Sequence, residues 1–506
     1  MKAILAYDLG GTAFKGALID LEGREITLDV VKQEPPVPDH RGWSEKDPEA
    51  WWRDFLRLTG SLLAKPEAVS AEILGLAVCG ITRTQVFLDR AGEPIRPAIT
   101  WADGRATEQA ARLVFSQARR DPRCRTFGPV NAYHTLSRIL WVKEEEPHNF
   151  AKVHVVLEPK DYLNFRLTGE TACDDVSLSR LLTVSDRTPA QDLFDSVNLP
   201  KDTIPVLKKP QEKLGIVRKN LEEPLDRLAG IPVFVGGMDA WCGSLGVGSV
   251  QAGEAFNVSG TSEVFGVVTA SFTEAEGLVT LPWGDDLYQI GGPSQAGADC
   301  LAWYIDAFER PGSGITPADL LYELPGFVRR KEPILFLPYI RGERTPLWDP
   351  DVRGAFLGIN RQHCRTDFLW AILEGVAFSN RQVLEMATAE EACRVQEIRI
   401  TGGAAASDIW CQTKADVLNL PVIRTRSTEA GLLGTAMVVL TGLGEYSRLQ
   451  ECQEALVRVE RVFEPRKERK DLYERLYERW IETQNTVVPL SRAMTRDVRK
   501  GSVTRI

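Results

Sequence analysis

The stretch "ILAYDLGGTAFKGALID", residues 4–20, places an apolar run on either side of a short polar segment. Both runs are strand-like, and Gly10, Gly11 and Thr12 between them predict a tight turn. Glycines leave the backbone N–H groups of a turn unobstructed, and such concave turns bind anions. The Thr12 hydroxyl and the Lys15 cation would add to that binding. We therefore expect a hairpin that binds a charged group, while an ordinary turn beside a surface lysine stays open as the alternative.

Asp8 lies where the first of these strands ends. Mg²⁺ prefers carboxylate ligands and retains several of its waters. A carboxylate beside an anion-binding turn therefore suits a magnesium ion that is held by Asp8 through water.

The bulk composition limits the kind of protein. The chain has 506 residues, 43% of them hydrophobic and 26% charged, with a net charge of -9. This length predicts more than one domain, and the acidic surplus argues against a nucleic-acid partner. No apolar run is long enough to cross a membrane. The nine cysteines form no C-x-x-C pair, which favours reduced thiols and a cytoplasmic protein over a zinc site.

Strand-like and helix-like segments alternate along most of the chain, which predicts an α/β fold with mixed sheets and crossover helices. Residues 253–268, "GEAFNVSGTSEVFGVV", repeat the opening order of strand, Gly-Thr turn and strand. The architecture thus restarts near residue 250. We predict a first domain over 1–250, a second over 251–486, and a basic, mobile tail over 487–506.

Two further glycine-bearing segments resemble the first turn. Gly260 and Thr261 form the turn of the second hairpin, and "ITGGAAASDIW", residues 400–410, joins a strand to a helix. The N-terminus of such a helix suits the phosphates of a nucleotide. Together the three segments predict bound ATP. Neither a P-loop motif nor a well-placed dinucleotide fingerprint occurs.

Asp239 lies in "VGGMDAWCG", residues 235–243, between an apolar strand and a helix. A partly desolvated carboxylate there could accept the proton of an alcohol during phosphoryl transfer. An aspartate that merely caps the helix would occupy the same position. The position alone leaves both interpretations open.

Two longer segments carry a resemblance. "GAFLGINRQHCRTDFLWAILE", residues 354–374, and "YHTLSRILWVKEE", residues 133–145, resemble the two signatures of the FGGY family of carbohydrate kinases. The second segment has Arg138 where the family normally has lysine. The resemblance extends over about residues 3–485. It implies two actin-like (ribonuclease H-like) ATPase lobes around an interdomain cleft, with the sugar mainly on the first lobe and ATP with Mg²⁺ mainly on the second.

The resemblance also implies roles for single residues. Asp8 resembles the carboxylate near the metal, and Asp239 matches the aspartate that deprotonates the acceptor hydroxyl. The nucleotide-binding positions that the resemblance implies are Gly11, Thr12, Lys15, Gly260, Thr261, Gly297, Gly403 and Ser407.

The sugar-binding positions implied by the resemblance are Thr82, Arg83, Trp101, Asp103, Tyr133 and Asp239. Thr82 and Arg83 replace the Met-His of xylulose kinases and the Arg-Glu of glycerol kinases. Trp101 could instead be a core aromatic, and local groups could satisfy Arg83. We rank a ketopentose such as xylulose first, with a polyol (glycerol, erythritol) or a sugar acid (gluconate) as alternatives. A catalytically silent ATP-binding sensor is the alternative of another class, and a homodimer is left open.

Overall fold

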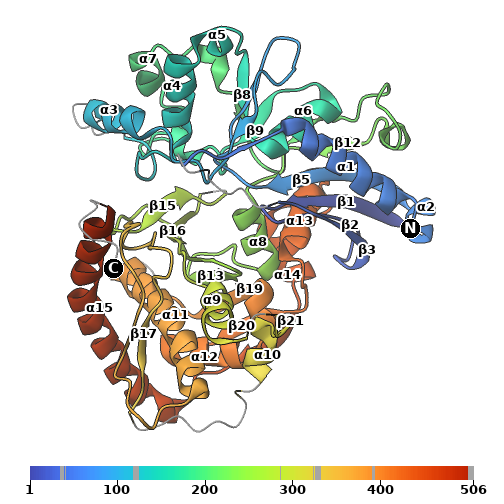
Figure 1. The fold of residues 1–506 in the computed structure, drawn as a ribbon. Helices are drawn as coiled ribbons and strands as arrows, with labels where there is room; N and C mark the ends of the chain where they lie inside the picture. Colours follow the sequence, from blue (N-terminus) through green and yellow to red (C-terminus); the bar gives the residue numbers. More distant parts are fainter. Residues whose placement is uncertain are drawn as a thin grey trace. The chain divides into compact units, whose positions relative to one another are not determined.

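The computed structural model divides into two compact units, whose elements Figure 1 labels. The first comprises Met1–Gly248, Leu281–Asp286 and Glu429–Val457, and the second comprises the segments between and after them. Residues 429–457 thus cluster with the first unit, whereas the sequence analysis assigned them to the second domain. The structure describes residues 1–34, 39, 42–117, 125–284, 286–310, 312–322, 324, 332–389 and 394–499.

The sheet of the first unit has the strand order β11-β12-β5-β1-β2-β3. Its strands are β1 (Lys2–Leu9), β2 (Ala13–Asp20), β3 (Glu25–Lys32), β5 (Glu72–Gly80), β11 (Lys213–Ile216) and β12 (Pro232–Phe234). β1 and β2 are antiparallel, which confirms the predicted hairpin, and β1 is parallel to β5. The mixed sheet expected from the alternating sequence pattern is therefore present.

Helices cover both faces of this sheet. The α1 helix (Pro48–Leu63) packs on β2 and β3, and α13 (Ala430–Leu443) packs on β1 and β5. Successive side chains of a strand point to opposite faces. The Tyr7 hydroxyl accordingly lies 2.9 Å from Thr59 Oγ1 of α1, whereas the next residue, Asp8, lies against Gly431 of α13. The end of β1 thus directs its carboxylate toward α13.

A second hydrophobic core of the first unit lies beside α4 (Thr135–Glu145). It includes Leu136 and Ile139 from that helix together with Phe87 of β6 (Val86–Leu88), and all three side chains are fully buried. The α3 helix (Thr107–Gln117) packs on α4, and α6 (Pro159–Thr168) packs on β5. These elements hold the loops that carry the predicted sugar-binding residues.

The sheet of the second unit repeats the leading hairpin. Its order is β15-β16-β14-β13-β19-β20-β21. The bounds are β13 (Glu254–Ser259), β14 (Glu263–Thr269), β15 (Val279–Pro282), β16 (Tyr288–Pro293), β19 (Glu397–Thr401), β20 (Val422–Thr425) and β21 (Val459–Phe463). β13 and β14 are antiparallel, and β13 is parallel to β19. The predicted restart of the architecture is confirmed.

The long helices of the second unit are α11 (Arg365–Thr388) and α15 (Lys470–Arg499). The expected mobile tail from residue 487 is wrong as far as Arg499, because α15 continues through it (Figure 1). Val488 and Ser491 are buried, so this part of the helix packs on its own unit. Residues 500–506 of the predicted tail lie outside the described residues.

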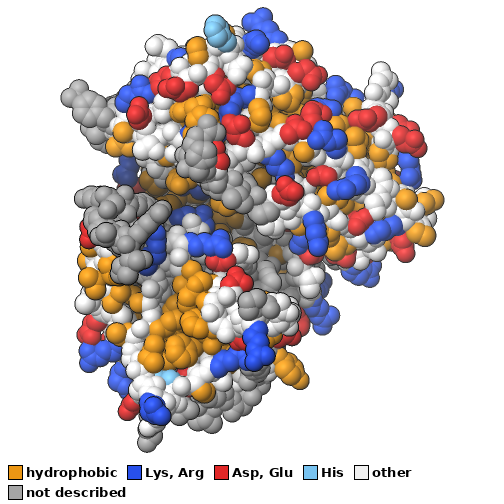
Figure 2. Space-filling model, viewed as in Figure 1, with side chains coloured by type: hydrophobic (Ala, Val, Ile, Leu, Met, Phe, Trp, Pro, Cys, Tyr) orange, Lys and Arg blue, Asp and Glu red, His pale blue; other side chains and the backbone are white. Residues whose placement is uncertain are grey.

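Charged and hydrophobic side chains are distributed differently on the face that Figure 2 draws. Figure 2 shows acidic and basic side chains interspersed on the visible face, with hydrophobic side chains gathered around α9 (Asp299–Phe308). The helices in the described part of the chain are all too short or too polar to span a bilayer.

Candidate active site

Two carboxylates meet at one edge of the first sheet. Asp8 pairs with Cys79 in the parallel ladder of β1 and β5, and Gly80 bridges to Met238. Parallel strand ends meet at the same edge of a sheet, so Asp8 and the residue after Met238 lie close together. The charge of Asp8 is indeed near enough to raise the pKa of Asp239. The sheet topology alone therefore assembles this pair.

Asp239 is the first residue of α8 (Asp239–Val247), whereas Met238 occupies the N-cap position without a side-chain cap. The alternative of a capping aspartate is therefore wrong. The Oδ1 atom of Asp239 accepts the backbone N–H of Ala240 at 2.7 Å, which orients the carboxylate. The side chain is half-buried, so one part of it stays available to a ligand.

The close packing of α8 on α13 fixes this helix. A Cβ on Gly246 would lie 1.9 Å from the carbonyl oxygen of Ala430, and a Cβ on Gly434 would lie 1.9 Å from that of Cys242. Only glycine permits backbones to approach so closely. A Cβ on Gly431 would lie 2.4 Å from Asp8 Oδ2. The same glycine-rich contact thus supports both carboxylates.

Removal from water raises the pKa of both carboxyl groups. The pKa of Asp239 rises to about 7, mainly through burial and then through the charge of Asp8, while Arg83 opposes the rise. Burial likewise raises the pKa of Asp8 to about 6, against the opposing charge of Lys15. Paired carboxylates with raised pKa values are typical of proton-transfer sites. Near neutral pH, Asp239 can therefore accept a proton.

The Gly10–Thr12 turn lies next to this pair. The Gly10 N–H donates to the Ala13 carbonyl at 2.9 Å, which closes the turn, and the Thr12 side chain is exposed. Lys15 stands opposite Asp8 in the hairpin ladder and forms an ion pair with Glu429 at 2.5 Å. A Cβ on Gly11 would lie 3.9 Å from the indole nitrogen of Trp101. The structure thus brings one predicted sugar residue next to the predicted phosphate turn.

Arg138 organises the loops of the predicted sugar-binding residues. Its guanidinium is fully buried and donates to the Arg83 carbonyl at 2.5 Å, the Trp101 carbonyl at 3.0 Å and the Asp103 carbonyl at 2.8 Å. Arg83 has a φ of 58°, a left-handed conformation that is strained for arginine. One side chain thus holds two loop segments in place, the one at Arg83 and the one at Trp101 and Asp103. Thr82 and Arg83 are partly exposed.

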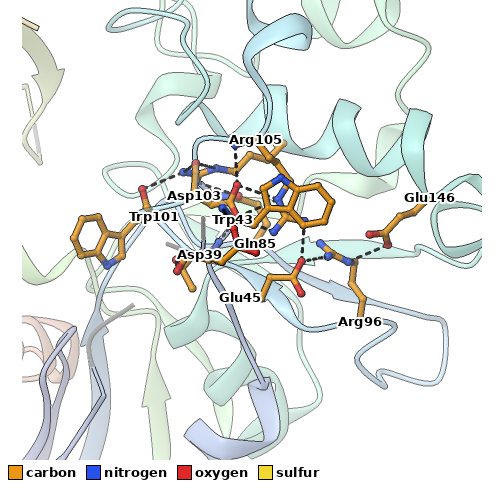
Figure 3. Close-up of polar contacts among 12 residues, drawn as sticks. Asp39, Trp43, Glu45, Gln85, Arg96, Trp101, Asp103, Arg105 and Glu146 are labelled. Carbon is orange, nitrogen blue, oxygen red and sulfur yellow. Dashed lines mark hydrogen bonds and ion pairs between the residues drawn. The ribbon is translucent and has the colours of Figure 1, made fainter. Parts of the chain in front are cut away.

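Asp103 has no exposed surface and is fully engaged. Its carboxylate accepts the Ser44 N–H at 2.6 Å and forms an ion pair with Arg105 at 2.7 Å. Arg105 also pairs with Glu45, and Figure 3 shows this network continuing to Arg96. Asp103 can therefore contribute to a sugar site only by positioning the residues around it.

Trp101 and Tyr133 differ from Asp103 in exposure. The Trp101 side chain points away from the ion-pair network in Figure 3 and is 38% exposed, so the alternative of a core aromatic is wrong. Tyr133 is 46% exposed and lies against Gly104. Both aromatic surfaces are open to a ligand.

The second unit contains a pocket of about 670 Å³. Four predicted nucleotide residues line it, together with apolar groups of α9, α10 (Pro317–Tyr322) and α12 (Asp408–Leu418): Gly260, Thr261, Gly403 and Ser407. Ser407 caps α12 by accepting the Trp410 N–H. The pocket therefore combines apolar walls with a capped helix N-terminus.

Gly297 supports this pocket from behind. A Cβ at this position would lie 2.8 Å from the Gly260 carbonyl oxygen and 2.7 Å from that of Thr261. The next residue, Ala298, donates its N–H to Gly260 at 2.9 Å. Gly297 thus allows the Gly-Thr turn to lie on the start of α9.

The sequence analysis missed several neighbours of these sites. Glu158, Arg180, Glu429 and Gly431 come from four segments without a recognised motif. Among these four residues, only Gly431 belongs to a local sequence pattern, the small residues spaced three apart in "AGLLGTA".

These features define a class of protein: two hairpin-led α/β units, one with an oriented carboxylate pair and one with a glycine-bounded pocket. Family models confirm it. The FGGY family of carbohydrate kinases matches with its N-terminal domain over residues 3–246 and its C-terminal domain over 255–442.

Relatives agree with this match. The xylulose kinase of Bacillus subtilis is 30% identical over 94% of this chain and 96% of its own. That of Escherichia coli is 32% identical over 82% and 84%. The ligand-bound xylulose kinase structure from Lactobacillus acidophilus superposes with a TM-score of 0.86 at 23% identity, over 96% and 98% of the two chains.

The chain belongs to the FGGY family of carbohydrate kinases, and its two units have the actin-like ATPase fold of that family. It is a kinase that phosphorylates sugars. Family membership implies ATP as the co-substrate.

Proposed function

We propose that this kinase transfers the γ-phosphoryl group of ATP to a hydroxyl of a ketopentose such as xylulose, with Asp239 as the general base. The oriented, half-buried Asp239 carboxylate is the observation that carries the proposal. Its raised pKa of about 7 suits a base that works near neutral pH. The full-length similarity to xylulose kinases supports the choice of sugar.

The proposed reaction is an in-line displacement. Asp239 accepts the proton of the sugar hydroxyl, the hydroxyl oxygen bonds to the γ-phosphorus, and ADP leaves. The Thr12 hydroxyl and the turn N–H groups orient phosphate oxygens, and Lys15 contributes positive charge beside Glu429. Trp101 and Tyr133 offer apolar surface to the carbon chain of the sugar.

The pocket of the second unit suits the adenosine part of ATP. Its apolar side chains would contact the base, and Gly403 and Ser407 lie at the N-terminal end of α12. Gly260 and Thr261 present the turn toward which the phosphates would extend. Gly297 is assigned the role of supporting this turn.

The residues of the first unit fit Mg²⁺. Asp8 supplies a half-buried carboxylate whose pKa burial raises, so a nearby cation would stabilise its charged form. Within the described residues no group of three or more potential metal ligands occurs. One carboxylate with waters and substrate phosphates is a common magnesium environment. When bound, Mg²⁺ would neutralise charge that develops on the phosphates.

The remaining alternatives differ in the acceptor or in catalysis. A polyol would need only the hydroxyl-binding surfaces, whereas a sugar acid would use the cation of Arg83. A silent sensor would bind ATP without turnover, but it has no need of an oriented base. We expect the enzyme to act in the cytoplasm, since the described cysteines are free.

A coupled assay of ADP release tests the proposal. Purified protein is incubated with ATP and Mg²⁺ and with ketopentoses, polyols or aldonic acids. We expect turnover with xylulose. ATP binding without turnover on any acceptor would contradict the proposal and favour the sensor.

A further inference from the structure

A buried ion pair lies behind the Gly260–Thr261 turn of the second unit, and the proposed reaction assigns it no role. The Lys414 Nζ atom lies 2.9 Å from each carboxylate oxygen of Glu263. Glu263 has no exposed surface, and Lys414 is only 2% exposed. Replacing such a pair by apolar side chains of similar volume is often neutral or stabilising. The stability of the fold therefore does not by itself account for the two charges.

The carboxylate of Glu263 joins the two strands that flank the turn. Glu263 is the first residue of β14, and Ser259, the last residue of β13, donates its hydroxyl hydrogen to Glu263 Oε1. The Asn257 Nδ2 atom of β13 donates to Glu263 Oε2 at 3.3 Å. The side chain thus closes the hairpin directly behind Thr261.

Lys414 connects this hairpin to a helix that lines the same pocket. It lies in α12, which Ser407 caps, and both Ser407 and Trp410 line the pocket of the second unit. The Trp410 ring centre is 5.9 Å from Lys414 Nζ. The ion pair therefore joins the Gly-Thr turn directly to the helix whose N-terminal end forms part of the pocket wall.

The ammonium group of Lys414 is held in one direction. It has three donors, and it donates to both oxygens of Glu263 and to Asn380 Oδ1 of α11. Burial lowers the pKa of Lys414, whereas the charge and the hydrogen bonds of Glu263 raise it. A lysine that turned away would leave a buried carboxylate without its partner, which is strongly unfavourable. The contact between the turn and α12 is therefore rigid.

We propose that Glu263 and Lys414 are positioning residues that fix the Gly260–Thr261 turn relative to the start of α12, so that the two ends of one nucleotide bind together. This inference rests on the proposed nucleotide site. Groups that are ordered before binding lose less freedom when the ligand binds. ADP, which would contact both the turn and α12, should therefore gain affinity from the pair. Adenosine, which has no phosphates for the turn, should not.

Titration calorimetry with ADP and with adenosine tests the inference. The double variant Glu263→Gln with Lys414→Met removes both charges, and the glutamine oxygen can still accept the Ser259 hydroxyl hydrogen. We expect the Kd for ADP to rise about tenfold and the Kd for adenosine to change by less than about twofold. Unchanged ADP affinity overturns the inference. Equal weakening of both ligands also overturns it, because a merely structural role predicts that result.

Two further variants separate positioning from a general loss of stability. Lys414→Arg keeps the charge and several donors, so it should retain most of the ADP affinity that the double variant loses. Tyr473→Phe is the control, since it removes a buried hydrogen bond to Glu374 Oε1 at 3.0 Å, and neither residue lines the pocket. An equally large loss of ADP affinity in Tyr473→Phe overturns the inference. If the double variant does not fold, Lys414→Gln replaces it, and an unchanged ratio of the two affinities again overturns the inference.

The two proposals fail differently. Wild-type protein that binds neither ADP nor adenosine contradicts the proposed nucleotide site and the inference with it. Wild-type ADP affinity in the double variant contradicts the positioning role alone and leaves the kinase reaction intact.

Discussion

The two units begin with the same hairpin and Gly-Thr turn but surround it differently. Beside the first turn lie partly exposed charges: Asp8, Asp239 and the Lys15–Glu429 pair. Behind the second turn, Glu263 is sealed in a buried ion pair with Lys414 at 2.9 Å, and the pocket in front is mainly apolar. Under the proposed function, the same backbone feature would serve proton chemistry in the first unit and nucleotide binding in the second.

Among the variants considered, Asp239→Asn is expected to have the largest effect on activity. The amide cannot accept the hydroxyl proton, so we expect kcat to fall by about 10²- to 10⁴-fold. The pocket of the second unit is untouched, so ADP affinity should change little. Asp226→Asn, an exposed acid in the turn Leu225–Leu228, is the control. Wild-type turnover in Asp239→Asn would show that Asp239 is not the general base.

The pH dependence should report the same carboxylate. Asp239 must be ionised to accept a proton, so kcat/KM should rise about tenfold per pH unit below about 7 and level off above it. A raised carboxyl pKa also means that the folded state holds the proton more tightly than the unfolded chain. The contribution of the Asp239 carboxyl to the free energy of unfolding is therefore greatest below about pH 3.9. It is lost as the pH rises through about 7.

Thermal unfolding checks the sign of this effect. Asp239→Asn should be more stable than the wild type at pH 8 and lose that advantage near pH 4. A flat kcat/KM profile between pH 5 and 8, or a less stable variant at pH 8, would contradict the raised pKa.

Gly297→Ala tests the second unit alone. Its Cβ would lie 2.7 Å from the Thr261 carbonyl oxygen and must displace the turn. We expect ADP affinity to fall about tenfold, or about 1.4 kcal/mol. Gly60→Ala is the control, since its Cβ would make only an ordinary 3.5 Å contact with Pro224. Wild-type ADP affinity in Gly297→Ala would show that this turn takes no part in nucleotide binding.

Arg138→Lys is expected to give the smallest effect. Lysine has one nitrogen and cannot reach the carbonyls of Arg83, Trp101 and Asp103 together, so the sugar loops should loosen. We expect the KM for sugar to rise several-fold, by about 1 kcal/mol, with ADP affinity unchanged. Arg53→Lys serves as the surface control. A change in kcat alone would argue against a positioning role.

Much of the fold could be predicted from the sequence because it depends on local patterns. The two hairpins follow from apolar runs around glycine turns, and the structure has both. The tail was mispredicted because its charges conceal the apolar contacts of residues such as Val488. The return of residues 429–457 to the first unit is a long-range event that local patterns do not record.

The site was predictable where it consists of backbone and less so where it consists of charge. The turns at Gly11 and Gly260 were found from glycine alone. The burial of Asp103 depends on partners such as Ser44, which lies far away in the sequence and which no local motif specifies. The resemblance identified Asp239, since its position alone also fitted a helix cap.

The central claim is that the first unit performs the proton chemistry and the second binds the nucleotide. The most direct test is ADP affinity, measured by calorimetry for Asp239→Asn and Gly297→Ala in parallel. We predict wild-type affinity in Asp239→Asn and about tenfold weaker affinity in Gly297→Ala. Equal loss of affinity in both variants, or loss only in Asp239→Asn, would contradict this division of roles.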